Sequence, residues 1–211
     1  MLAYAPQAWT SDDTDAVERL RIQWGTSLVY PLSAMAAHVS AVPNHQVGRT
    51  TPLATRAATA FFGVLGYELD PVALTAEERA AIRAQVAFYT THRTLFQRGR
   101  FLRLVSPFQG AGERTAWMTV APDGRAAAVG LFHVLNHPEP GPERLRLRGL
   151  DRHARYRVTC WPPAADSVAR RNEGLRGGDE LMAAGLIVEA ERDEVAARGD
   201  YWARLFLLER A

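Results

Sequence analysis

The 211-residue chain can bury one large core or two small ones, and its 47% hydrophobic and 23% charged residues are ordinary for a globular protein. The formal net charge is +2, and every basic residue is a scattered arginine, so we predict no nucleic-acid partner. No stretch has the ~18 consecutive apolar residues of a membrane span, so we predict no membrane partner. A single cysteine, Cys160, excludes an internal disulfide framework.

The first 30 residues predict a strand followed by a helix. Residues 1–9, MLAYAPQAW, are typical of a strand that begins in mid-run, and they have no charged region that would suggest a signal peptide. Thr14 or Asp15 is expected to cap the helix, and Asp15 with Glu18 resembles a capping box. Pro31 ends the helical run.

Two further strand–helix pairs are predicted before residue 98. The small apolar runs 33–42 and 61–69 suit strands buried on both faces, and Thr51 with Pro52 suits the start of a helix between them. Residues 76–98 form the clearest helical pattern, with Thr75 and Glu78 as a capping box. Its predicted buried face consists of Ile82, Val86, Tyr89 and Phe96. The alternation of strands and helices predicts parallel strands with crossover helices.

After Gly99 the pattern changes to short β-type runs separated by turn sequences such as APDGR and LRGGDE. Leu145, Leu147 and Leu150 alternate with arginines, as in a strand with one buried face. Such runs favour an antiparallel β-sandwich. The predicted fold is therefore α/β followed by all-β, with domains at residues 1–98 and 101–211 and a boundary near 98–101.

Three aspartates, Asp12, Asp13 and Asp15, crowd the junction between the first strand and its helix. A helix N-terminus stabilises negative charge, which accounts for Asp15 and for Asp13 without any function. Asp12 precedes the cap positions, so its carboxylate is expected at the C-terminal mouth of the strand. In α/β barrels that mouth holds the catalytic residues, which makes Asp12 the candidate catalytic residue.

Several stretches resemble bacterial α-galactosidases of glycoside hydrolase family 36, in order from about Tyr4 to Glu209. They include WTSDDTDAVERLRIQWGTSLVYPLSAMAAHVSAVPNHQVGRTTPLATR, FFGVLGYELD, RLRLRGLD, GDELMAAGL and DYWARLFLLE. The resemblance implies the C-terminal part of a (β/α)8 barrel, strands six to eight, followed by a C-terminal β-sandwich. It also assigns the general acid/base to the serine-aspartate element, here Ser11-Asp12, and retaining chemistry to the family.

The chain departs from the family pattern in one large respect. The family nucleophile lies in a motif resembling Lys-Trp-Asp-Met-Asn-Arg, and no lysine and no such motif occur here; the Cys-Ser-Gly-Gly substrate loop is absent too. Retaining hydrolysis needs two carboxyl groups about 5–5.5 Å apart. The chain alone is therefore expected to lack turnover, with the N-terminal part of the barrel as a missing partner.

Other residues have two readings each. His38 is either a core histidine or part of the active-site mouth, and Trp9 either packs or stacks on a sugar. Asn44 and His45 follow the second strand and are better placed for a substrate role. Glu68 and Asp70 end the third strand and either face the site or cap the next helix. Cys160 is expected to be a packed thiol.

The resemblance implies hydrolysis of terminal non-reducing α-D-galactose from oligosaccharides such as melibiose and raffinose, with Asp12 as acid/base and this α-galactoside as the substrate partner. The alternative is a non-catalytic relic whose sandwich serves packing or sugar contact. The six histidines show no metal-ligand spacing, so neither a metal nor a cofactor is predicted. A cytoplasmic location is expected, and the resemblance allows a homo-oligomer because many relatives are tetramers.

Overall fold

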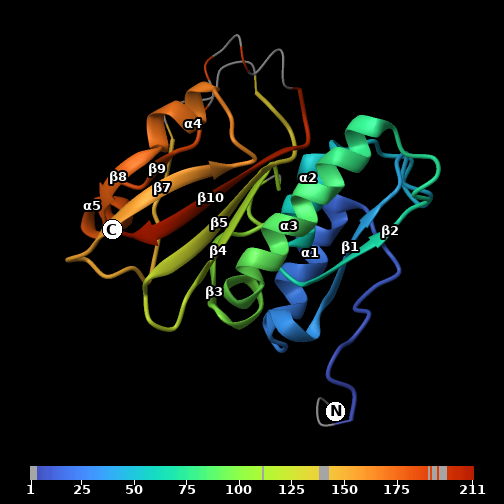
Figure 1. The fold of residues 1–211 in the computed structure, drawn as a ribbon, viewed down its shortest axis with the longest axis horizontal. Coiled ribbons are helices and arrows are strands. Elements are labelled where there is room, and N and C mark those ends of the chain that lie inside the picture. Colours follow the sequence, from blue (N-terminus) through green and yellow to red (C-terminus); the bar gives the residue numbers. More distant parts are fainter. Residues whose placement is uncertain (1–3, 111, 138–142, 190, 192–193, 195–198) are drawn as a thin grey trace. The chain divides into compact units, whose positions relative to one another are not determined.

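The computed structural model describes residues 4–110, 112–137, 143–189, 191, 194 and 199–211 (Figure 1). The chain divides into two compact units, Met1–Arg98 and Gly99–Ala211. Each unit has its own sheet and its own hydrophobic core. None of the helices in the described ranges combines the length and apolar character of a membrane span.

The first unit is built on parallel pairing, as the strand–helix alternation predicted. Strand β1 (Ala36–Ser40) pairs in parallel with β2 (Val64–Glu68), and Ala8 forms a parallel bridge with Met35. The predicted strand at residues 1–9 is wrong in extent. Residues 4–9 contain only this single bridge, and residues 1–3 lie outside the described residues.

The connecting helices are α1 (Ala16–Thr26), the short 3-10 helix η1 (Leu32–Ala34), α2 (Leu53–Ala60) and α3 (Ala76–Arg98). The predicted capping box of α3 is confirmed: the Glu78 amide donates to Thr75 Oγ1 at 3.2 Å, and the Thr75 amide donates to Glu78 Oε2 at 2.9 Å. Helix α2 begins one residue later than predicted, with Pro52 at the cap position.

Two predictions of burial in the first unit are wrong. Strand β2 is half-exposed rather than buried, because among the described residues it pairs only with β1. On α3, Tyr89 and Phe96 are buried, whereas Val86 is 44% exposed. The buried end of α3 joins an aromatic cluster in which Phe61 packs against Tyr89 and Phe96.

The second unit contains a six-stranded antiparallel sheet in the order β3-β4-β5-β10-β7-β8 (Figure 1). Its strands are β3 (Arg100–Val105), β4 (Arg114–Val120), β5 (Ala126–His133), β10 (Trp202–Arg210), β7 (Arg155–Trp161) and β8 (Gly174–Gly177). The last strand in sequence, β10, therefore lies in the interior of the sheet between β5 and β7.

A thinner layer covers one face of this sheet. It consists of the two-stranded pair β6 (Arg144–Leu145) and β9 (Leu186–Ile187) with the short helices α4 (Ser167–Asn172) and α5 (Gly178–Ala183). Leucines 145, 147 and 150 are all buried in the core between the layers, as their alternation predicted. The antiparallel sandwich is thus confirmed.

The prediction of a turn at the LRGGDE segment is wrong. It contributes β8 and the start of α5. A Cβ at Gly178 would lie 2.1 Å from the Asp151 carbonyl oxygen, so glycine here serves close backbone packing rather than a turn.

Candidate active site at the carboxyl ends of the parallel strands

The carboxyl ends of the parallel strands in the first unit define one edge. In the register of β1 and β2, Ser40 lies opposite Glu68, and both residues end their strands. Asp12 follows the Ala8 bridge by four residues, so it lies toward the same edge. Because parallel strands all point the same way, the segments that leave them come together at that edge, which is the face that α/β barrels use for catalysis.

The three crowded aspartates have different environments. Of the two predicted caps, Thr14 and Asp15, the structure selects Asp15 as the N-cap of α1. Its Oδ1 accepts hydrogen bonds from the amides of Val17 and Glu18, both at 3.0 Å. The second half of the predicted capping box is absent, because the Asp15 amide donates to Asp13 Oδ1 at 2.9 Å instead of to Glu18. Asp13 therefore also has a structural role.

Asp12 differs from its neighbours. Its side chain is exposed, and within the described part of the chain it makes no hydrogen bond or ion pair. On the N-terminal side Thr10 has φ of 70°, a left-handed conformation that is strained for a β-branched residue. The Asp13 amide donates to Ser11 Oγ at 3.1 Å, so the backbone turns tightly around Asp12. The carboxylate is consequently presented to solvent by a fixed backbone.

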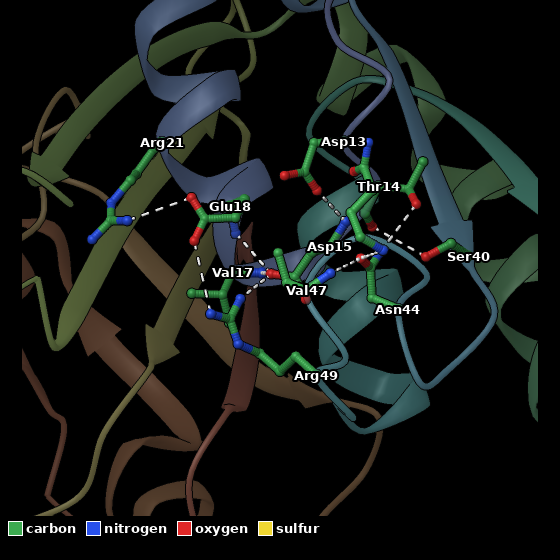
Figure 2. A network of polar contacts seen from close by, with 11 residues as sticks. Asp13, Thr14, Asp15, Val17, Glu18, Arg21, Ser40, Asn44, Val47 and Arg49 are labelled. Atoms are coloured by element: carbon green, nitrogen blue, oxygen red, sulfur yellow. Dashed lines mark hydrogen bonds and ion pairs between the residues drawn. The ribbon is translucent and has the colours of Figure 1, made fainter.

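The loop after β1 is fastened to the cap of α1 (Figure 2). Asn44 is buried: its Oδ1 accepts from the amides of Gln46 at 2.9 Å and Val47 at 3.1 Å, and its Nδ2 donates to Thr14 Oγ1 at 3.4 Å. Arg49, at the end of the loop, forms an ion pair with the Asp15 carboxylate. Asn44 thus organises the loop, whereas His45 beside it is exposed at the edge.

Two buried arginines bind backbone carbonyls at opposite ends of β1, Arg19 at Ala36 and Arg56 at Ser40. The Arg19 guanidinium donates to Thr10 Oγ1 at 3.1 Å and to the Ala36 carbonyl at 2.5 Å. Burial lowers the pKa of Arg19 to about 10, against the opposing effect of the Asp13 charge. Arg56 donates to the Ser40 carbonyl at 2.5 Å, and burial lowers its pKa as well. Each guanidinium thus donates to a backbone carbonyl of β1 and fastens its own helix to that strand.

Trp9, His38 and Gly66 form a layer across the sheet. The Trp9 and His38 rings lie 4.1 Å apart, and a Cβ at Gly66 would lie 2.8 Å from His38 Cδ2. The adjacent residue Tyr67 donates through its hydroxyl to Gln85 of α3 at 2.9 Å. Because side chains alternate along a strand, Gly66 and His38 lie on the face directed away from α3.

Neither His38 nor Trp9 is fully buried, and their rings contact each other. Trp9 is 48% exposed, and His38 Nδ1 is buried without a partner among the described residues. Burial and then the Arg19 charge lower the pKa of His38, while Glu68 opposes them. His38 thus packs against Trp9, and its partial burial leaves open both expected roles, core residue and part of the active-site mouth.

Of the remaining candidate residues, Glu68 lies at the carboxyl edge of the strands, whereas Asp70 and Cys160 have structural environments. Glu68 is exposed at the end of β2, on the edge that also holds Asp12. Asp70 accepts from the Val72 amide at 2.9 Å in a local turn, so it does not cap α3. Cys160 lies in the second unit as a packed thiol, and burial raises its pKa to about 12. Across the described ranges, no three His, Cys, Asp or Glu side chains gather as they would around a metal ion.

Sequence reasoning missed Arg19, Arg49 and Arg56 altogether. Each acts through partners distant in sequence: Arg49 contacts Asp15 across 34 residues, and Arg19 contacts Ala36 across 17. The twenty-odd other arginines of the chain carry no local pattern that distinguishes these three from solvent-exposed ones. Only the folded arrangement identifies them.

Comparison with known proteins gives the family. Residues 1–99 match the Melibiase family model, and residues 114–208 match the model of the glycosyl hydrolase family 36 C-terminal domain. The chain is 51% identical over 186 residues to α-galactosidase AgaA of Geobacillus stearothermophilus. This match covers 88% of this chain and 24% of that protein. It is 47% identical over 156 residues to the bifunctional α-galactosidase/sucrose kinase AgaSK of Mediterraneibacter gnavus, covering 74% of this chain and 16% of that one.

Solved structures agree. A family 36 α-galactosidase AgaB from G. stearothermophilus superposes with a TM-score of 0.88 at 46% identity, and a variant of AgaA in complex with raffinose superposes with a TM-score of 0.88 at 45% identity. Each comparison covers the whole of this chain and 26% or 27% of the other chain. The chain spans about a quarter of the length of these relatives, and it belongs to glycoside hydrolase family 36, where it matches the C-terminal portion of the α-galactosidases.

Proposed function

We propose that this chain supplies the acid/base part of the active site of a retaining α-galactosidase. The substrate class is oligosaccharides with a terminal non-reducing α-D-galactose, such as melibiose and raffinose. One observation above all supports it: the Asp12 carboxylate is exposed at the carboxyl edge of the parallel strands and is bonded to no described residue, while the backbone on both sides is fixed. Variants of the relative AgaA have been solved in complex with raffinose and with stachyose.

Asp12 has a different task in each half of the reaction. In the first half, protonated Asp12 donates its proton to the glycosidic oxygen while a separate carboxylate attacks the anomeric carbon. In the second half, the Asp12 carboxylate takes a proton from water as that water attacks the galactosyl-enzyme. An exposed carboxylate on a rigid turn suits both steps, because it can reach the sugar and can exchange its proton with solvent.

The attacking carboxylate belongs, by the resemblance, to a motif that these 211 residues do not contain. We therefore expect the 211-residue chain alone to hydrolyse nitrophenyl α-galactoside no faster than buffer. Turnover that survives repurification and disappears in Asp12→Ala would contradict this expectation, because half a site would then suffice.

The catalytic role of Asp12 is tested in a chimera in which this chain replaces the matching portion of AgaA. Asp12→Asn keeps the size of the side chain and removes the transferable proton. General acid/base steps contribute about 10²–10⁴-fold, so kcat/KM on raffinose should fall by that order. It should fall much less for an aryl galactoside with an activated leaving group, and azide should partly restore turnover.

Two outcomes would count against the proposal. A chimera that folds but shows no turnover with Asp12 intact would favour the alternative of a non-catalytic packing or sugar-contact module. A chimera in which Asp15→Asn shows the leaving-group dependence and azide rescue, and Asp12→Asn does not, would move the acid/base to Asp15. The structure makes that second outcome unexpected, because Asp15 is 2% exposed and already accepts from two amides and Arg49.

A further inference from the structure

The segment that presents Asp12 is held at both ends by arginine side chains. At its beginning, Arg19 of α1 donates to Thr10 Oγ1 and to the Ala36 carbonyl. At its end, Arg49 pairs with the carboxylate of the N-cap Asp15 (Figure 2). Between these points two hydrogen bonds fix the backbone: the Asp13 amide donates to the Ser11 hydroxyl, and the Asp15 amide donates to the Asp13 carboxylate. The position of Asp12 is therefore determined by its neighbours and not by contacts of its own.

The Asp15 end depends on a residue from another part of the chain. The Asp15 side chain is 1% exposed, and its Oδ1 accepts from two amides as well as from Arg49. Arg49 Nη2 also lies 3.8 Å from Glu18 Oε1 in the first turn of α1. The planar guanidinium thus lies between two carboxylates of one helix start, an arrangement that a single point charge cannot reproduce.

The loop that carries Arg49 is itself rigid. Asn44 accepts from the amides of Gln46 and Val47, and the Arg49 carbonyl accepts from the Asn44 amide at 2.8 Å. Asn44 and Ser40 also bond Thr14, through its hydroxyl and its carbonyl. The end of β1, its loop and the cap of α1 therefore form one hydrogen-bonded unit, and Arg49 is its charged connection to Asp15.

We propose that Arg49 is a positioning residue for Asp12. It touches neither substrate nor the reacting atoms; it fixes the cap at Asp15, and through Asp13 and Ser11 it fixes the turn that aims the Asp12 carboxylate. A general acid must lie within hydrogen-bond reach of the glycosidic oxygen, and a misplacement of ~1 Å can cost on the order of 10²-fold in rate. The inference rests on the proposed function of Asp12.

The test compares Arg49→Met with Arg21→Met in the AgaA chimera. Arg21 is a matched control: it pairs with the same Glu18, at 3.4 Å, but its side chain is 46% exposed and it does not contact Asp15 in any described interaction. Arg49→Met should lower kcat/KM on raffinose by roughly 10-fold to 100-fold. The loss should be clearly smaller for an activated aryl galactoside, because that leaving group departs without a proton. Arg21→Met should leave both values unchanged.

A second readout uses the 211-residue chain itself. Amide hydrogen exchange at Asp13 and Asp15, whose amides bond Ser11 and Asp13, should accelerate in Arg49→Met and stay protected in Arg21→Met. If Arg49→Met yields no folded chimera, Arg49→Lys provides the kinetic comparison. Lysine keeps the positive charge but lacks the planar guanidinium that can contact two carboxylates at once. Arg49→Lys should show a smaller loss with the same leaving-group dependence.

The outcomes are distinguishable. A loss on raffinose and on the aryl galactoside by the same factor would mean that Arg49 only stabilises the fold, and so would unchanged exchange at Asp13 and Asp15; either result overturns the inference. If Asp12→Asn itself shows no leaving-group dependence, the proposed function fails, whatever Arg49 does. If Asp12→Asn shows it and the folded Arg49 variants do not, only the positioning role fails.

Discussion

Both units of the chain bury apolar side chains, but only the first also buries arginines and an aspartate among its described residues. The second unit surrounds an apolar cluster that draws on both of its layers, including Met118, Val129, Tyr156 and Phe206. The first unit has a short parallel sheet beside which several polar side chains are buried: Asp15, Asn44 and Arg56 toward its carboxyl edge, and Arg19 at the start of β1. An apolar core stabilises without directing any one group, whereas a satisfied polar network fixes the positions of its members. The unit that presents Asp12 is the one built on the network.

The comparison is tested most severely by separating the units. We expect a polypeptide of residues 99–211 to be soluble and to unfold cooperatively, since all strands of its sheet pair within it. A polypeptide of residues 1–98 should aggregate, because it exposes the half-buried strand β2 and unpaired parallel edges. Size-exclusion chromatography and urea unfolding of both pieces measure this. A monomeric, cooperative first unit beside an unfolded second unit would reverse the comparison.

Removing a large side chain from the apolar core should have the next largest effect. Phe206 is fully buried in the interior strand β10, so Phe206→Ala should lower the free energy of unfolding by about 3–5 kcal/mol. Leu175→Ala on β8 is the control, because Leu175 is 38% exposed and should change stability by less than ~0.5 kcal/mol. Equal losses in the two variants, measured by urea unfolding, would mean that the core is not where the structure places it.

The tight contact beneath His38 gives a smaller, conditional effect. In Gly66→Ala the new methyl group would meet the His38 ring, so we expect a loss of about 1–3 kcal/mol. The same change in a His38→Ala background should cost little, because the obstructing ring is gone. A double-mutant cycle measured by urea unfolding gives this coupling. A coupling energy near zero would show that the Trp9–His38 layer is loose.

The smallest effect is expected at a position that the sequence pattern misassigned. Val86 fits the apolar repeat of α3 but is 44% exposed, so Val86→Lys should change the free energy of unfolding by no more than ~0.5 kcal/mol. Phe96→Ala, at a fully buried position of the same helix, should cost about 3–5 kcal/mol. Thermal unfolding of both variants measures the difference. A costly Val86→Lys would restore the original pattern-based assignment.

What the sequence determined by itself was local or repetitive. Asp15 and the Thr75–Glu78 pair act over three residues, the leucines at 145, 147 and 150 reveal their burial by a period of two, and strand–helix alternation implies parallel pairing. These signals depend on backbone geometry that every helix or strand shares. The position of Asp12, ahead of the cap residues, made it the catalytic candidate, and the resemblance of whole motifs added the family and the acid/base role expected of it.

The tertiary structure decided everything that depends on which distant segments meet. It placed Arg49 on Asp15, Trp9 on His38, and β10 between β5 and β7, and it left β2 and Val86 partly exposed. Periodicity says which side of an element is apolar, but it does not say how much of that side a neighbour covers. The sequence around an arginine is the same whether its side chain points into water or forms an ion pair with a buried carboxylate. The partner is determined by the tertiary fold and not by the neighbouring residues in the chain.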